Sequence, residues 1–193
     1  MPVLLSFLLG IFSMGFQLLG SRMLSPWFGS SVIVWAFIIS VFLAGFSLGS
    51  IGGGLLARLP REPRARAATW IAALAVAGFA LNAVFAGGFL AWLDRLSLPL
   101  PLALGLTCGL LFLPPVGTLA ALTPLLVQHL HERGRSAGFA SGLISCTSTL
   151  GNIAGIMLTA FFFIPLLPIS TLLGIWTAGV AIVTVLVCRC LRS

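Results

Sequence analysis

The sequence predicts an all-α, multi-pass membrane protein with six transmembrane helices, and three observations support this prediction. Apolar residues make up 60% of the 193 residues and charged residues only 7%, whereas a soluble domain carries about a quarter charged residues. The mean hydropathy is +1.20. The charges are clustered, and the apolar runs between the clusters reach the ~20 residues that a helix needs to cross a bilayer. We therefore expect one six-helix domain over residues 1–193.

Six apolar runs define the predicted spans, and each is expected to be helical because backbone groups in hydrocarbon must be satisfied within their own segment. Runs such as AFFFIPLL also lack the alternation of apolar and polar residues that barrel strands show. The predicted spans are residues 3–21, 32–57, 67–90, 102–127, 137–164 and 169–188.

Each span has a feature that marks its place in the bundle. The first carries Gln17 and is followed by Arg22, and the second is lined with glycines. The third follows an arginine cluster, and prolines interrupt the fourth, where we expect a break. The fifth is rich in serine and threonine, and the sixth ends at Arg189.

The arginines predict the orientation. Eight of the ten basic residues lie in the three segments that follow the second, fourth and sixth predicted spans. They are Arg58, Arg61, Arg64, Arg66, Arg133, Arg135, Arg189 and Arg192. By the positive-inside rule these segments and both termini are expected in the cytoplasm. Contacts with anionic head groups account for the net charge of +7 without a nucleic-acid partner. The partner expected from composition is the lipid bilayer.

Glycine spacing predicts close helix packing. Gly45, Gly49 and Gly53 recur at four-residue steps in the second span, and Gly151 and Gly155 do so in the fifth. Small residues allow helix backbones to approach in lipid, where little hydrophobic force acts between helices. Packing within the chain and a dimer interface are both consistent with these faces.

Polar side chains at membrane depth are the candidate cavity or substrate residues. They are Gln17, Asn82, Asn152 and Thr123, together with Arg22 near the outer membrane interface. For each amide, hydrogen bonding between helices is the structural alternative, and Arg22 has the alternative of extending to the head groups. No Asp, Glu or His lies in the middle of a span, and the four cysteines match no zinc pattern. We expect no catalytic residue, metal or cofactor.

Five segments resemble the membrane half of the fused major-facilitator-like spermidine synthase family. They are GFQLLGSRMLSPWFGSS (15–31), LAGFSLGSIGGGLLA (43–57), LTPLLVQHL (122–130), STLGNIAG (148–155) and FIPLL (163–167). The resemblance implies a fold like half of a major facilitator transporter, with six helices built as three plus three, in a bacterial cytoplasmic membrane. No internal sequence repeat shows this division.

The sequence departs from that family in three ways. It has no motif of the aminopropyltransferase domain, so we expect no enzymatic activity in this chain. Gln17 stands where the family has a glutamate, and the loop at Arg58 lacks the acid of the major facilitator signature. Without a buried acid, polyamine transport is disfavoured, because a multiple cation needs carboxylates in its path.

Two functions remain open from the sequence. The first is a half-size transporter-like protein, acting as a homodimer, for a small neutral or anionic solute. The second is a non-catalytic accessory or anchoring subunit of a larger membrane complex. The transport prediction rests on Arg22, Gln17 and Asn152.

Overall fold

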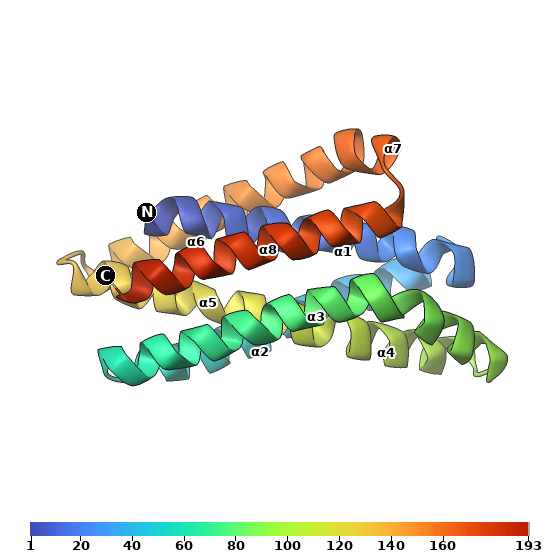
Figure 1. Ribbon diagram of the computed structural model, residues 1–193, viewed down its shortest axis with the longest axis horizontal. Coiled ribbons are helices and arrows are strands. Elements are labelled where there is room, and N and C mark those ends of the chain that lie inside the picture. The colour runs from blue at the N-terminus through green and yellow to red at the C-terminus, as the bar shows by residue number, and fades with distance from the viewer. Residues whose placement is uncertain (193) are drawn as a thin grey trace.

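The computed structural model describes residues 1–192 as a bundle of long helices (Figure 1). The elements are α1 (Pro2–Phe28), α2 (Val32–Ala57), α3 (Arg61–Arg95), α4 (Leu100–Leu111), α5 (Leu113–Glu132), α6 (Ala137–Leu158), the π-helical turn η1 (Thr159–Phe163), α7 (Ile164–Leu166) and α8 (Ile169–Arg192). Among these residues, five helical segments are long and apolar enough to cross a membrane, or six if the bent pair α4–α5 is one span. The prediction of an all-α, multi-pass membrane protein is confirmed.

The helices run further than the predicted spans. α1 continues to Phe28, so that Arg22 and Trp27 lie within the helix, and α3 begins at Arg61 directly after Pro60. An apolar window identifies the part of a helix that lies in hydrocarbon, whereas backbone hydrogen bonding continues into the interface. The 35 residues of α3 therefore extend well beyond the ~20 that a bilayer core requires.

The fourth span is broken where the prolines predict a break. α4 and α5 meet at an angle of 43°, and Pro115 has no N–H to donate to the carbonyl oxygen of Leu111. Asn82 of α3 replaces that donor, with its Nδ2 2.7 Å from the Leu111 oxygen and 2.9 Å from that of Gly78. Asn82 is therefore a link between α3 and the bend.

All the arginine-rich segments lie at one end of the bundle. Both chain termini and the turns that follow α2 and α5 are at this end, which we call the arginine-rich end, and the other turns are at the opposite end (Figure 1). This arrangement suits a chain that crosses a membrane six times. That the arginine-rich end faces the cytoplasm stays a prediction from the positive-inside rule.

Two parallel helix pairs form the bundle by the same backbone contacts. α1 packs along α6, and α2 packs along α5. A Cβ atom at Gly49 or Gly53 of α2 would meet the backbone oxygens of α5, and one at Gly151 or Gly155 of α6 would meet those of α1. The oxygens belong to Gly117, Ala121, Phe7 and Ile11, respectively. In each pair, successive backbone contacts are therefore four residues apart on both helices.

These contacts relate the first three spans to the last three. If the two halves are exchanged, α5 takes the place of α1, α2 that of α6, and α8 that of α3. The pair α1–α6 then coincides with the pair α5–α2, and α3 and α8 remain each other's main partners. The match extends to residues, because the Ser6–Thr147 contact of the first pair corresponds to the Val116–Gly45 contact of the second. The structure therefore contains a three-plus-three repeat that is not visible in the sequence.

Four phenylalanines fill the centre of the bundle. Phe16, Phe42, Phe79 and Phe112 come from α1, α2, α3 and the α4–α5 junction, and each is at most 1% exposed. The Phe16 ring centroid lies 4.4 Å from that of Phe79 and 5.6 Å from that of Phe112. The centre of a single chain is therefore packed with side chains, and cavities lie on its faces.

Candidate functional site

A cavity of about 250 Å³, lined by both polar and apolar residues, lies between α1, α2, α5 and α6. Its polar lining residues are Ser13, Ser50, Thr123, Ser145, Ser148, Thr149 and Asn152. Ser13 and Asn152 lie near the middle of the helical segments that carry them. Ser50, Ser145 and Thr149 are exposed, so the cavity opens on a face of the bundle. The two glycine-packed pairs bring these four helices together.

The polar side chains of the cavity have few partners within the chain. Across residues 1–192, Ser13, Thr123 and Asn152 form no side-chain hydrogen bond, while Thr149 donates to the carbonyl oxygen of Ser145 on its own helix. A polar group without a partner in an apolar medium costs several kcal/mol. These side chains therefore suit a cavity that holds water or a solute, or a face that another protein covers.

Asn152 lies against α1 because Gly10 has no side chain. A Cβ atom at Gly10 would lie 2.9 Å from the backbone nitrogen of Asn152 and 3.1 Å from its Oδ1. Gly151, the preceding residue, contacts the backbone of Phe7. The amide is thus positioned by two glycines, and its donor and acceptor remain available.

Pro124 leaves one backbone carbonyl oxygen of α5, beside the cavity, without its usual helical donor. It lies inside α5 and cannot donate to the carbonyl oxygen of Ala120, four residues earlier. Ala120 and Thr123 both line the cavity. Irregular backbone of this kind occurs at membrane depth where protein or a cavity receives the freed group.

Gln17 lies one helical turn beyond Ser13 on the same face of α1, toward the end opposite the arginines. It is half-buried, and its side chain forms no hydrogen bond within the described part of the chain. It does not line the cavity. Its spacing from Ser13 places it beyond the cavity, in the direction of that end.

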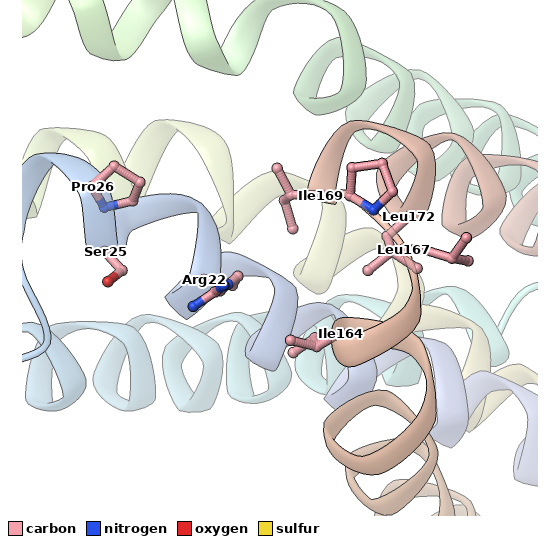
Figure 2. A pocket seen from close by; sticks show the side chains of 8 residues that line it. Arg22, Ser25, Pro26, Ile164, Leu167, Ile169 and Leu172 are labelled. Carbon is pink, nitrogen blue, oxygen red and sulfur yellow. The ribbon is translucent and has the colours of Figure 1, made fainter.

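Arg22 belongs to a different cavity, of about 360 Å³, near the end of α1. In Figure 2, Arg22, Ser25 and Pro26 of α1 lie opposite apolar side chains of α7 and of the turn that follows it, among them Ile164 and Leu167. Arg22 is exposed, and no acidic residue lines this cavity. Nine residues of helix, about 13 Å, separate it from Ser13. The structure brings Asn152 and Thr123 together and places Arg22 elsewhere.

Asn82 is outside both cavities. It is 3% exposed, and its two hydrogen bonds tie α3 to the bend of the fourth span. Its contacts are those of the structural alternative, hydrogen bonding between helices.

The sequence reasoning missed an ion pair at the arginine-rich end. Glu132, the last residue of α5 and beyond the apolar part of the span, accepts hydrogen bonds from both terminal nitrogens of Arg64 at 2.7 and 2.6 Å. Arg61 and Gln128 add bonds at 3.3 and 3.1 Å. The Arg64 guanidinium lowers the pKa of Glu132 to about 2. Glu132 pairs with Arg61 and Arg64 of α3 and lies 68 positions from Arg64.

No family model, curated protein or solved structure matches this chain. Within residues 1–192 there is no group of three or more His, Cys, Asp or Glu residues that could hold a metal ion. The cavity, its lining residues and the repeat between the two halves of the bundle are therefore the features that bear on function.

Proposed function

We propose that two copies of this chain form a half-size, transporter-like protein that moves a small neutral or anionic solute across a bacterial cytoplasmic membrane. One observation carries the proposal. A cavity lined by seven polar residues lies at membrane depth and opens on a face of the bundle, where lipid tails alone would leave hydroxyl and amide groups unsatisfied.

The arrangement of the helices supports this proposal. The repeated pairs α1–α6 and α2–α5 surround the cavity, and α3 and α8 lie away from it. Internal repeats with a site at their interface are typical of secondary transporters. The resemblance to the membrane half of the major-facilitator-like spermidine synthase family agrees with this architecture. Because phenylalanines fill the centre of one chain, we place the path between two copies.

The lining favours a neutral solute over an anion. Hydroxyl and amide groups line the cavity, and the residues that form it include no charged side chain. Arg22, the cation on which an anionic solute would depend, lies in the other cavity. The three acidic residues, Glu62, Asp94 and Glu132, are also outside the lining, which disfavours polyamines.

Dimerisation through the cavity face can be tested with a native cysteine. Cys146 is exposed on α6 next to Ser145 of the cavity lining, Cys108 and Cys190 are buried, and Cys188 of α8 is half-buried. In a Cys188→Ser background, used for both proteins compared, we expect a short bifunctional thiol reagent to cross-link the protein with native Cys146 into dimers in membranes. A control with Cys146→Ser and Leu81→Cys, which moves the thiol to an exposed position on α3, should remain monomeric. Equal cross-linking of both would contradict the proposed face.

Transport is tested in proteoliposomes with labelled glycerol, urea, lactate, phosphate, putrescine and spermidine. We expect flux above that of protein-free vesicles for an uncharged solute and none for the two polyamines. The absence of flux for every solute from a dimer with the expected cross-link would reject transport.

The alternative is a non-enzymatic accessory or anchoring subunit of a larger membrane complex. The same observation favours it, since another membrane protein could cover Ser50, Ser145 and Thr149. Purification in a mild detergent distinguishes the two proposals. A stoichiometric larger assembly supports the subunit, and a homodimer supports the transporter.

A further inference from the structure

A groove of about 630 Å³ lies between α3 and α8, on the side of the bundle opposite the cavity that Asn152 and Thr123 line. Its walls at depth are apolar, formed chiefly by Ala73, Val76 and Ala77 of α3 and by Ala181 and Val185 of α8. We propose that this groove binds an anionic phospholipid, with the phosphate at Arg189 and Arg192 and one acyl chain along the alanines.

Small side chains create the groove. The helices are linked at the arginine-rich end, where Arg192 donates to the Thr69 hydroxyl at 3.1 Å and the Cys188 thiol lies 3.7 Å from the carbonyl oxygen of Ala68. Ala73 and Ala77, further along α3, are exposed. Because alanine does not fill the space between two helices, a channel remains that is open to the lipid.

The length of the groove matches one leaflet. From Thr69 to Ala77 the rise of α3 is about 12 Å, and from Ala181 to Arg192 that of α8 is about 16 Å. Half of a ~30 Å hydrocarbon core is about 15 Å. An acyl chain that begins at the arginines therefore ends near the end of the groove, close to the bilayer middle.

The charges identify the head group. Arg189 and Arg192 lie three residues apart on one face of α8, at the mouth of the groove, and both are exposed. Neither forms an ion pair with an acid within residues 1–192. Two guanidinium groups without a carboxylate favour a phosphate with net negative charge, and basic pockets between helices at the cytoplasmic surface bind such lipids.

The side chains that line the groove suit an acyl chain rather than a polar ligand. Thr184 lines the groove, but its hydroxyl donates to the carbonyl oxygen of Val180 on its own helix at 2.8 Å. Its methyl group is therefore what it can offer to an occupant. Beyond the arginines, Thr69 and the Cys188 thiol, the groove presents hydrocarbon, which is the surface that an acyl chain contacts.

The head-group part of the proposal is tested with the full chain in nanodiscs of phosphatidylcholine containing a small fraction of phosphatidylglycerol. Native mass spectrometry counts the bound lipid. We expect wild type to retain phosphatidylglycerol over phosphatidylcholine, and R189Q/R192Q to bind it about 30-fold more weakly. The control R58Q/R135Q removes the same charge at the same end, outside the groove, and should bind as wild type does. An equal loss in both double variants would show nonspecific surface attraction and overturn the proposal.

The acyl-chain part has its own variants. Ala77→Leu fills the groove without entering the core, because Ala77 is exposed, and Ala44→Leu adds the same atoms to an exposed position of α2. We expect Ala77→Leu to lower phosphatidylglycerol binding severalfold and Ala44→Leu to leave it unchanged. Inorganic phosphate should not displace the lipid. Unchanged binding by Ala77→Leu, or displacement by phosphate alone, would show that no chain lies in the groove.

Discussion

Two polar regions of this bundle differ in how their groups are satisfied. At the arginine-rich end, Glu132 accepts bonds from Arg61, Arg64 and Gln128. In the cavity, Asn152 and Thr123 have no side-chain hydrogen bond within residues 1–192. A group whose bonds are complete stabilises the fold, whereas a group with free bonding capacity at membrane depth can bind a ligand. The contrast separates structural residues from candidate functional ones.

Glu132→Ala should have the largest effect on stability. The Arg64 side chain is only 4% exposed, whereas that of Glu132 is 23% exposed, so removal of Glu132 leaves a buried guanidinium without its partner, at a cost of up to about 3–5 kcal/mol. Glu62→Ala is the matched control, because the Glu62–Arg66 pair is exposed and 4.0 Å long, and we expect a change within about 0.5 kcal/mol. Unfolding in detergent measures both, and similar values for the two variants would contradict the structural role of Glu132.

The same pair predicts a pH dependence. The pKa of Glu132 falls from an ordinary value of 4.5 to about 2 in the folded protein. Because the folded pKa is the lower one, the stabilisation is complete above about pH 4.5 and is lost as the pH falls toward 2. The difference in stability between wild type and Glu132→Ala should shrink over this interval and remain constant from pH 6 to 8. A constant difference down to pH 2 would contradict the assignment.

The glycine contacts should show the next largest effect, since they position the cavity helices. Gly49→Ala and Gly151→Ala each place a methyl group on a facing backbone, and we expect each to cost about 1–3 kcal/mol. Gly52→Ala and Gly142→Ala are controls with open space at the Cβ position, and alanine there should be neutral or stabilising by up to about 1 kcal/mol. If the two halves are equivalent in packing, the costs at Gly49 and Gly151 should agree within a factor of two.

Thr123→Val should have the smallest effect on stability and should test the cavity directly. The change removes only a hydroxyl that has no partner within the described chain, so we expect a stability change within about 0.5 kcal/mol and a clear loss of solute flux. Thr118→Val is the control on the same helix, because the Thr118 hydroxyl bonds to the carbonyl oxygen of Pro114 at 2.9 Å and lies outside the cavity. An equal loss of flux in both variants would remove the distinction between the two regions.

Much of the fold could be predicted from the sequence, because a bilayer requires long apolar helices and prolines interrupt them. The break at Pro114 and Pro115 followed from this chemistry. The rotation of each helix about its own axis, which decides which side chains face one another, could not be predicted in the same way. Asn152 and Thr123 lie in one cavity and Arg22 in another, although the depths of all three along their helices could be estimated from the sequence.

Contacts between residues far apart in the sequence could not be predicted either. The partner of Arg64 is Glu132 on α5, whereas sequence reasoning sought an acid next to Arg58. The repeat between the two halves is likewise a repeat of backbone contacts, with Ser6 and Thr147 on one side and Val116 and Gly45 on the other. Side chains that share no chemistry can occupy equivalent places in such a repeat.

The phenylalanine centre has a mechanical consequence. Phe16, Phe42 and Phe112 join three segments through mutual ring contacts, with centroids 5.6 to 6.0 Å apart, and close-packed interiors transmit strain rather than deform gradually. The segments that meet at these rings, namely α1, α2 and the α4–α5 junction, are therefore expected to move as one rigid unit. If two chains form the proposed dimer and move a solute, the distance between two labels within this unit should stay constant during transport, while the distance between labels on the two chains should change.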